Sequence, residues 1–403
     1  MRLGRFPCSC CPGADTLGVE VVVEGVGAAG FSTATPNLNW KELMFQAASR
    51  AYEDAGGLNP RKDVGAFITC AEDYWEGFGI FDEFTPDQMG GVLRPNFTVT
   101  GDGLHGLAQA FMILRSGLFD RVAVEAHSKA SDLVSYRDIL LHAFDPIWHK
   151  PLAGDPHFLA GLEMASYLGR SGATEEDCAR VVVKNRGNAH RNPLASFEGR
   201  LAVEDVMRSP KVSDPLKHLD IAPLADGSVV FVLANRRVAR GDRLVPLRGV
   251  GWSEDTPFPE SRDGLAGTAA ALAVRQAARV ARVEALGGKL DLAEVDDQFA
   301  FKELQHLEAL GLAPPGRAHE QAAHGRFDAD GELPVNVSGG SLGVGNLLEA
   351  KGLARALEVV TQLRGEAGSR QVEGASLGLA HAWRGLPTAS HAVAVFSDGG
   401  GAK

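Results

Sequence analysis

The feature that most constrains this chain is the alternation of apolar, strand-like runs with amphipathic, helix-like segments. The run VEVVVEGVGAAGF at residues 19–31 is rich in β-branched residues and ends in glycines, as expected of a buried strand that leads into a loop. The next segment, residues 39–57, has an apolar residue at every fourth position from Leu43 to Ala55 and predicts a helix. The order continues with a strand, a helix and a strand at residues 63–70, 103–117 and 119–127. Such alternation is typical of layered α/β folds.

The second part of the chain repeats this order after a polar connector, RRVARGDRL. Strand-like and helix-like segments alternate again at residues 244–253, 265–280, 290–299 and 348–365, and two closing strands follow. One helix in each part, 103–117 in the first and 348–365 in the second, is entered from a Gly-rich loop. These parallels predict an internal duplication, and with it two similar halves that meet near residue 243.

The expected domain boundaries follow from this reading. The N-terminal half spans residues 19–242 and the C-terminal half spans residues 243–403. Residues 1–18 are expected to form a flexible tail. The alternation loosens from about residue 130 to about residue 215, and this segment is interpreted as an inserted cap.

Composition narrows the class of function. With 403 residues and 45% hydrophobic content, the chain can bury a large core. Its net charge of -11 opposes binding to nucleic acid or to an anionic membrane surface. The sequence contains no run of about 18 apolar residues, and its first residues lack the apolar core of a signal peptide. We therefore expect small-molecule chemistry in the cytoplasm.

The cysteines predict neither a disulfide framework nor a metal site. Five cysteines are too few and too clustered to hold a chain of this length together. Cys8, Cys10 and Cys11 could bind a metal, but no His or Cys pair follows them, and a loose tail is the favoured interpretation.

Four motifs, in the order and spacing of one known family, identify the chain as similar to that family. They are VVVKNRGNAHRNPLASF (181–197), DIAPLADGSVVFVLAN (220–235), NVSGG (336–340) and GLARALEVVTQLRGEAGSRQV (352–372). Together they resemble the thiolase superfamily, in particular the branch of the sterol carrier protein x thiolase domain and its archaeal and bacterial acetyl-CoA acetyltransferase-like relatives. The resemblance covers roughly residues 19–400.

The resemblance implies the thiolase fold, a duplicated αβαβα architecture in five layers. It also implies a coenzyme A thioester as the substrate, with no bound cofactor. A homodimer is expected, in which the strand NFTVTG (96–101) pairs with its two-fold mate. Relatives also pair with a paralogous thiolase or with an OB-fold and zinc-ribbon protein, so a heteromer is a second possibility.

Two of the loops that carry cysteines in thiolases lack them here. Counting back from Gly117 at the end of helix 103–117 places Thr100 at the position of the family's nucleophilic cysteine. In the segment EVDDQF, Asp296 stands at the family's histidine and Gln298 at its second cysteine. Asp296 and its neighbour Asp297 could together supply a base, or they could cap the following helix.

The remaining two loops supply the other candidates. Asn346 stands where the family has a catalytic histidine, so it can donate a hydrogen bond to an oxyanion but cannot accept a proton. Asn346 could instead tie the turn to the start of the following helix. His381 is the best surviving base, although a buried structural histidine is an equal alternative.

The residues expected to contact substrate are Gly339, Gly340, Asp297 and Gln298. The glycines of the NVSGG and ADG turns could equally be packing features that the fold itself requires.

Two functions of different class remain. The first is an enzyme that never forms an acyl-enzyme, for example a retro-aldol lyase that cleaves a 3-hydroxyacyl-CoA. Thiolase-like aldolases are thought to use tyrosines at the site, whereas the four tyrosines here (Tyr52, Tyr74, Tyr136 and Tyr167) lie off the aligned motifs. The second is a catalytically inactive thiolase-like subunit that pairs with an active partner.

Overall fold

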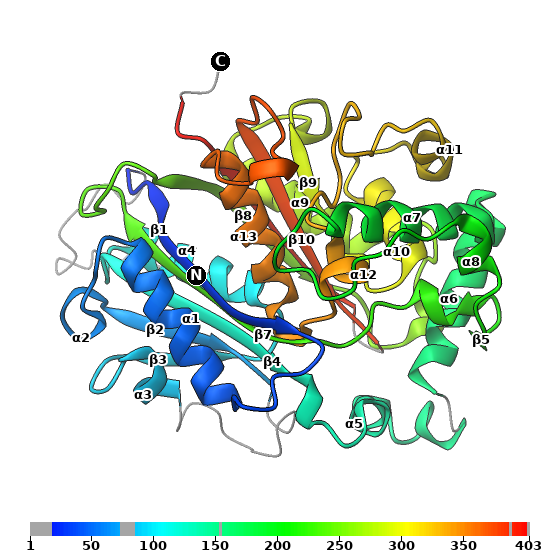
Figure 1. Ribbon diagram of the computed structural model, residues 1–403, viewed down its shortest axis with the longest axis horizontal. Coiled ribbons are helices and arrows are strands. Elements are labelled where there is room, and N and C mark those ends of the chain that lie inside the picture. Colours follow the sequence, from blue (N-terminus) through cyan, green and yellow to red (C-terminus); the bar gives the residue numbers. More distant parts are fainter. Residues whose placement is uncertain (1–17, 73–84, 153–154, 387–388, 401–403) are drawn as a thin grey trace, which may run out of the picture.

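The computed structural model describes residues 18–72, 85–152, 155–386 and 389–400. The predicted N-terminal tail, with Cys8, Cys10 and Cys11, lies outside the described residues, except for Gly18. Figure 1 shows the strands running through the middle of the molecule, with helices on both sides of them and between them. Within the described part of the chain, no helix is both long and apolar enough to span a bilayer.

The first half forms a mixed sheet with the strand order β3-β2-β4-β7-β1. Its strands are β1 (Val21–Ser32), β2 (Ala66–Cys70), β3 (Asn96–Val99), β4 (Arg121–Lys129) and β7 (Asp226–Asn235). β1 pairs with β7 and β7 with β4 in antiparallel fashion, whereas β2 runs parallel to both β4 and β3. β3 is therefore an edge strand.

The second half repeats this topology. Its strands are β8 (Val245–Glu254), β9 (Leu292–Glu294), β10 (Leu377–Arg384) and β11 (Ser390–Ser397), in the order β8-β11-β10-β9. β8 with β11 and β11 with β10 are antiparallel, and β10 with β9 is parallel. A parallel bridge from Ala293 to Val335 takes the place that β3 has in the first half. The predicted duplication is thus visible strand by strand.

The two sheets meet at β1 and β8, which pair over two residues, Val22 with Pro246 and Val23 with Val245. The nine strands therefore form one continuous series. The predicted boundary near residue 243 falls in the connector between β7 and β8.

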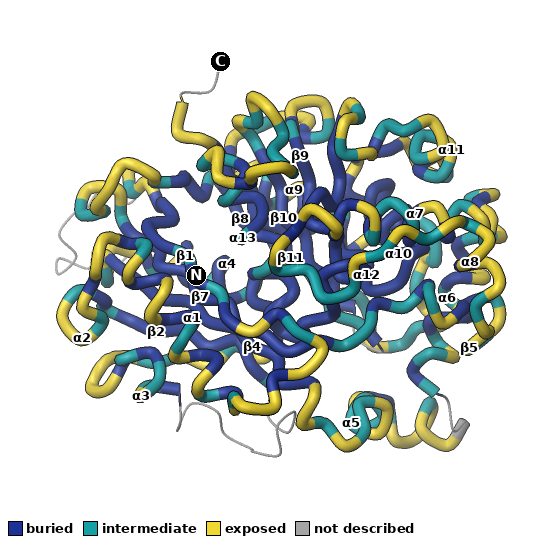
Figure 2. The backbone as a smooth tube through the Cα atoms, in the orientation of Figure 1, coloured by how far each residue is buried: buried dark blue, intermediate teal, exposed yellow. Residues whose placement is uncertain are grey.

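Helices complete five layers, which confirms the predicted architecture. α1 (Trp40–Asp54) covers the outer face of the first sheet, and α9 (Thr268–Ala281) covers that of the second. α4 (Gly103–Ser116) and α13 (Lys351–Leu363) pack against each other between the sheets. These two are the helices that were predicted to correspond, because each follows a Gly-rich loop. Figure 2 shows the strands as mostly buried, with the exposed residues concentrated in peripheral segments.

Glycines in corresponding strands let the outer helices approach closely. A Cβ on Gly27 of β1 would lie 2.2 Å from the Ala47 carbonyl oxygen of α1. A Cβ on Gly251 of β8 would lie 2.1 Å from the Ala273 carbonyl oxygen of α9. Any side chain at either position would collide with helix backbone, so each half uses the same packing device.

The described residues of the segment predicted as a cap include the α-helices α5 (Tyr136–His142), α6 (Pro156–Ser171), α7 (Glu175–Ala189) and α8 (Val203–Met207). α7 packs on helices of the second half, namely α10 (Ala300–Ala309), α11 (Ala318–Ala323) and α12 (Gly340–Val344). Further short elements include α2 (Pro60–Asp63), α3 (Thr85–Met89), β5 (Lys211–Ser213) and β6 (Leu216–Lys217).

Candidate functional site

Four chain segments that the sequence motifs single out meet around a small cavity of about 70 Å³. They are the N-terminus of α4, the loop after β9, the loop before α13 and the end of β10. α5 closes one side. The lining residues are Glu72, Asp102, Tyr136, Ile139, Leu140, Ala143, Gln298, Asn346, Leu348, Glu349, Lys351, Arg384, Gly385 and Leu386. Of the predicted site residues, the cavity brings together Asn346 and Gln298.

Asn346 is held in place by hydrogen bonds of its backbone and of its side-chain oxygen Oδ1. Its N–H donates to the Pro223 carbonyl at 2.7 Å, and its carbonyl accepts from the Ala225 N–H at 3.1 Å. Its Oδ1 accepts from the Leu348 N–H at 3.2 Å, the local tie that the alternative interpretation expected. The Nδ2 group stays available to donate into the cavity.

Gln298 points a second amide into the same space. Its Oε1 accepts from the Lys351 ammonium at 2.7 Å, which directs its Nε2 group away from that lysine. Hydrogen bonding from the side chains of both Asn346 and Gln298 acts to lower the pKa of the Tyr136 hydroxyl. Two amides therefore converge on one oxygen, as the donors of an oxyanion hole do.

Tyr136 was not expected at the site. The residue is partly exposed on α5, but its hydroxyl is enclosed. Burial raises the pKa of Tyr136, the Glu349 carboxylate raises it further, and the hydrogen bonds from Asn346 and Gln298 oppose both effects. The phenol is therefore protonated at neutral pH. Tyr136 lies off the aligned motifs in the sequence, yet the fold brings it to the motif residues Asn346 and Gln298.

Asp102 lines this cavity together with two other carboxylates, Glu72 and Glu349, and the sequence analysis missed it. It is the N-cap of α4: its Oδ1 accepts from the Leu104 N–H at 2.8 Å, and its Oδ2 accepts from the Gly352 N–H at 2.9 Å. Burial raises the pKa of Asp102 to about 6, against the opposing effects of these N–H groups and of Lys351 and Arg355. An Asp directly before an apolar helix is an N-cap signal that could have drawn attention to it.

Thr100 lies two residues before this cap, at the end of β3. Thr100 is exposed to solvent and does not line the cavity. The helix that follows begins at Gly103, and the buried polar side chain at its start is Asp102.

The neighbouring carboxylates Asp296 and Asp297 are fully buried and serve different contacts. Asp296 pairs with Arg355 at 2.9 Å and with Lys351 at 3.3 Å. Although burial opposes ionisation, these two cations lower the pKa of Asp296 well below its ordinary value. Asp296 is thus a permanently charged anchor and not a proton acceptor.

Asp297 holds the loop 338–346. It accepts hydrogen bonds from the Ser341 N–H at 2.6 Å and from the Leu342 N–H at 3.1 Å, at the start of α12. Burial raises its pKa, while Arg355 opposes that shift. The predicted capping alternative for this acidic pair therefore describes Asp297, although the helix that it caps is α12 and not α10.

Gly339 and Gly340 sit where the loop packs most tightly. A Cβ on Gly339 would lie 2.6 Å from the Ala189 Cβ, and one on Gly340 would lie 2.1 Å from Asp297 Oδ2. Both have positive φ, +103° and +57°. These contacts fit the packing alternative and place neither glycine in the Asn346 cavity.

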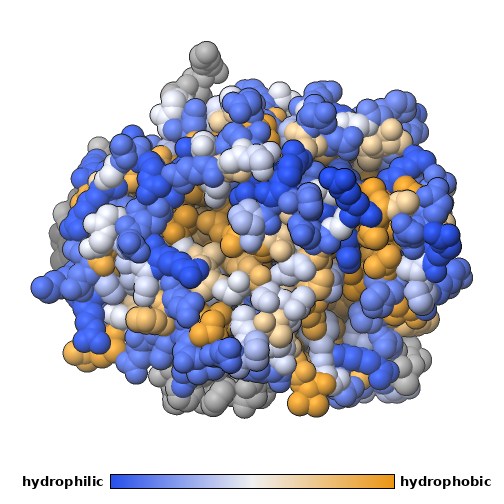
Figure 3. Space-filling view, viewed as in Figure 1, coloured by the Kyte–Doolittle hydropathy of each residue, from blue (hydrophilic) through white to orange (hydrophobic). Residues whose placement is uncertain are grey.

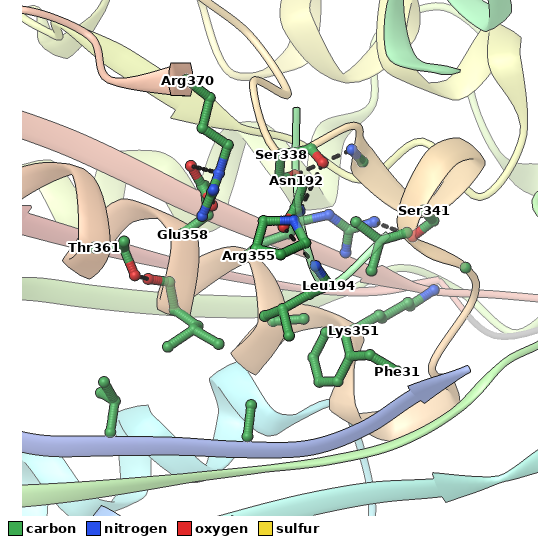
Figure 4. Close-up of a pocket in the computed structure, with 18 of the residues that line it drawn as sticks. Phe31, Asn192, Leu194, Ser338, Ser341, Lys351, Arg355, Glu358, Thr361 and Arg370 are labelled. Atoms are coloured by element: carbon green, nitrogen blue, oxygen red, sulfur yellow. Dashed lines mark hydrogen bonds and ion pairs between the residues drawn. The ribbon is translucent and has the colours of Figure 1, made fainter. Parts of the chain in front are cut away.

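The other side of the same loop faces a second cavity of about 320 Å³, between β1 and α13. Figure 4 shows Arg355 reaching the Ser341 hydroxyl, and Glu358 of α13 paired with Arg370, which follows that helix in the chain. The wall opposite is apolar and includes Phe31, Leu194 and Val344. On the face drawn in Figure 3, apolar residues gather in a hollow near the middle of the molecule. Lys351 lines both cavities.

His381 lies outside the Asn346 cavity. It is fully buried on β10, where its Nε2 is 3.0 Å from Nδ1 of His391 and its Nδ1 accepts a long contact of 3.4 Å from the Asp296 N–H. Burial, with a contribution from His306, lowers the pKa of His381 well below its ordinary value. Arg384, at the end of the same strand, and the following Gly385 and Leu386 do line the cavity, where Arg384 pairs with Glu72.

Neither of the two described cysteines reaches this cavity. Cys70 and Cys178 are buried free thiols, and burial raises the pKa of both well above the ordinary value. A protonated, enclosed thiol is a poor nucleophile.

This chain is similar to known proteins over most of its length. A family model described as "Thiolase C-terminal domain-like" matches residues 253–398. The acetyl-CoA acetyltransferase of Methanothermobacter thermautotrophicus is 31% identical over 368 residues, which cover 90% of this chain and 95% of that protein. Sterol carrier protein 2 of Bos taurus is 29% identical over 90% of this chain and 69% of its own length.

Solved structures agree in fold. The Ltp2-ChsH2(DUF35) aldolase superposes with a TM-score of 0.80 at 22% identity, covering 96% of this chain and 100% of that chain. Human mitochondrial 3-ketoacyl-CoA thiolase gives a TM-score of 0.72 at 14% identity, covering 94% and 99%.

Proposed function

Because this chain belongs to the thiolase superfamily, we propose that it acts on a coenzyme A thioester and breaks or forms the carbon–carbon bond next to the thioester group. The reaction that suits its side chains is retro-aldol cleavage of a 3-hydroxyacyl-CoA, without a cysteine acyl-enzyme. The observation that carries the proposal is the convergence of two amide donors on one oxygen beside a buried carboxylate. The similarity in fold to an aldolase supports the choice of reaction.

A residue of the cavity can carry out or support each step of the proposed cleavage. The Asp102 carboxylate removes the proton from the 3-hydroxyl group, and the C2–C3 bond breaks as C3 becomes a carbonyl. The electron pair moves onto the thioester and forms an enolate, whose oxygen accepts from Asn346 and Gln298. The protonated Asp102 then returns its proton to C2. The products are a shortened acyl-CoA and an aldehyde or ketone, so atoms and charge balance.

Lys351 supports this arrangement from one side. Its ammonium holds Gln298 Oε1 at 2.7 Å and Asp296 at 3.3 Å, so it orients the amide and places positive charge near the developing enolate. Its charge also lowers the pKa of Asp102 against the effect of burial, which keeps the base ionised at neutral pH.

The cavity must open before a thioester can enter. Its volume of about 70 Å³ is small, since bound ligands usually occupy ~300–1,000 Å³. Tyr136 fills the oxygen position, and α5, which carries it, contains no buried residue. A small apolar cluster that includes Leu348 and Ile139 attaches α5 to the site. We propose that α5 moves aside and that the substrate oxygen replaces the Tyr136 hydroxyl.

The proposal is tested by mass spectrometry of products after incubation with a panel of 3-hydroxyacyl-CoA and 3-oxoacyl-CoA thioesters. A shortened acyl-CoA together with a carbonyl product, formed from a 3-hydroxyacyl-CoA, supports cleavage by this chain. The Asp102→Asn variant should lose this product, whereas Thr100→Ala, an exposed change outside the cavity, should keep it.

A catalytically inactive subunit remains the alternative, and the same experiment decides it. The panel is repeated with a paralogous thiolase or an OB-fold and zinc-ribbon protein added. If product forms only with an added thiolase, and Asp102→Asn does not alter its rate, the chain is a subunit and the proposed chemistry is refuted.

A further inference from the structure

Three histidines of the second half form a cluster that lies outside the Asn346 cavity. His306 comes from α10, His381 from β10 and His391 from β11. One ring nitrogen of each lies within 4.8 Å of one from each of the others. The centroid of the His306 ring lies 4.7 Å from that of the His381 ring and 5.4 Å from that of the His391 ring. All three side chains are buried, with at most 5% of the residue surface exposed.

The hydrogen bonds leave this cluster short of partners. His306 Nδ1 is 2.8 Å from the Asp296 carbonyl oxygen, so that nitrogen carries the proton and donates. Its Nε2 is then a bare acceptor, and it has no hydrogen-bond partner although it is fully enclosed. Buried polar atoms of this kind are rare and call for an explanation. A histidine that binds a metal through one nitrogen normally donates the other N–H to a carbonyl group, as His306 does.

The cluster borders a large cavity. About 500 Å³ of space adjoins His306 and His391, and its walls include Trp148, Phe158 and Leu162. This cavity is different from the Asn346 cavity: Trp383 lines the former, and the residues that follow it on the chain line the latter. A group bound by the histidines would therefore be reached from this side.

We propose that His306, His381 and His391 bind one divalent transition-metal ion of the zinc type, with a fourth position open to the large cavity. Imidazole nitrogens are ligands that zinc prefers, and three of them with an open position are typical of reactive zinc sites. A tetrahedral ion with Zn–N bonds of ~2.0–2.1 Å holds its ligand nitrogens ~3.3 Å apart. The His381–His391 contact of 3.0 Å is already near that value. His306 must approach by at most ~1.5 Å, given the 4.8 Å limit on the present separations.

Binding requires one change of proton position. His381 Nε2 and His391 Nδ1 now share a proton across their 3.0 Å contact, and a metal ion would replace it. His381 then carries its proton on Nδ1, which ends the 3.4 Å contact from the Asp296 N–H and turns these two N–H groups toward each other. In exchange, the ion satisfies the bare Nε2 of His306.

The surrounding charges determine the fourth ligand. Asp296 is anionic but already pairs with Lys351 and Arg355. Lys302, whose ammonium lies 4.4 Å from the Trp383 ring centroid, pairs with Glu163 at 2.7 Å. A dication bound by three neutral imidazoles keeps its full charge, so the site favours an anionic fourth ligand, either hydroxide or a carboxylate that reaches it through the cavity.

Equilibrium dialysis of tag-free full-length protein against Zn²⁺, followed by elemental analysis, tests the site. We expect one zinc ion per chain. His306→Gln, which removes a ligand, should weaken binding by at least ~100-fold, because loss of even a group that only orients a ligand costs 10–100-fold. His149→Gln is the matched control: it removes a histidine of the same cavity that pairs with Glu260 and is no ligand, so binding should stay unchanged.

Cobalt provides a second readout. Co²⁺ bound by the wild type should give visible absorption of a four-coordinate nitrogen site, and acetate should shift it by occupying the open position. His391→Gln should abolish these bands, which keeps the test open if His306→Gln fails to fold. No zinc retained by the wild type, no cobalt bands, or equal binding by wild type and a folded ligand variant would each overturn the proposal.

Discussion

Replacing Asn346 with Ala separates the chemical role of this side chain from its structural role. The change removes the Nδ2 donor that converges with Gln298 on one oxygen. It also removes the Oδ1 acceptor of the Leu348 N–H, whereas both backbone hydrogen bonds of residue 346 remain. We expect kcat to fall by about 10²-fold, or ~2.7 kcal/mol in the activation free energy, as for loss of one oxyanion-hole donor.

The free energy of unfolding should change less than the activation free energy. Loss of the side-chain acceptor for Leu348 should cost ~1 kcal/mol, the usual effect of removing such a local cap. Asn346→Ser is the matched control, because a serine hydroxyl can accept from the N–H two residues ahead but lacks the amide donor. The serine variant should recover stability and not turnover.

The assay measures kcat and KM with the best 3-hydroxyacyl-CoA of the panel and unfolding in denaturant for the wild type and both variants. Equal turnover in all three proteins would refute the donor role. A turnover loss that the serine variant reverses would mean that Asn346 acts only by holding the loop. Asn346→His should not create thiolase activity, because the loop would regain its base without a cysteine partner.

Four further results are expected. Asp102→Asn should lower turnover by ~10²–10⁴-fold. The wild type should be active above a pH of about 6 and lose activity as the pH falls through that value, because the carboxylate is the active form. A rate that is independent of pH between 5 and 8 would contradict this role. Tyr136→Phe should lower KM and leave kcat largely unchanged, because it removes the hydroxyl that competes for the two amides; a large loss of kcat would instead make Tyr136 a proton donor. Intact-mass measurement after exposure to acetyl-CoA should show no acetyl adduct, and an adduct on Cys70 or Thr100 would overturn the proposal that no acyl-enzyme forms. Sedimentation should show a dimer at micromolar concentration through the exposed edge strand β3, and a monomer there would exclude that interface.

The sequence by itself determined the layered duplication. Strand and helix periodicities are local, and glycines such as Gly27 and Gly251 occupy corresponding strands because each must let a helix backbone approach. The thiolase fold could therefore be predicted from motifs and their order, and it is confirmed. Asn346 and Gln298 were singled out by matching two loops of the chain to family loops, and the structure brings both side chains to one cavity.

The tertiary structure alone decided which polar groups share a space. Asp102 and Gly352 are hydrogen-bonded across 250 positions of the chain, so no local pattern could show that α4 and α13 meet there. Tyr136 reaches the amides only because α5 folds back over them. Asp296 and Asp297 are adjacent in sequence, yet Arg355 and Lys351 keep the first ionised while burial raises the pKa of the second. The charge state of a buried group depends on its solvent exclusion and on partners from distant segments, and only the packed chain brings these together.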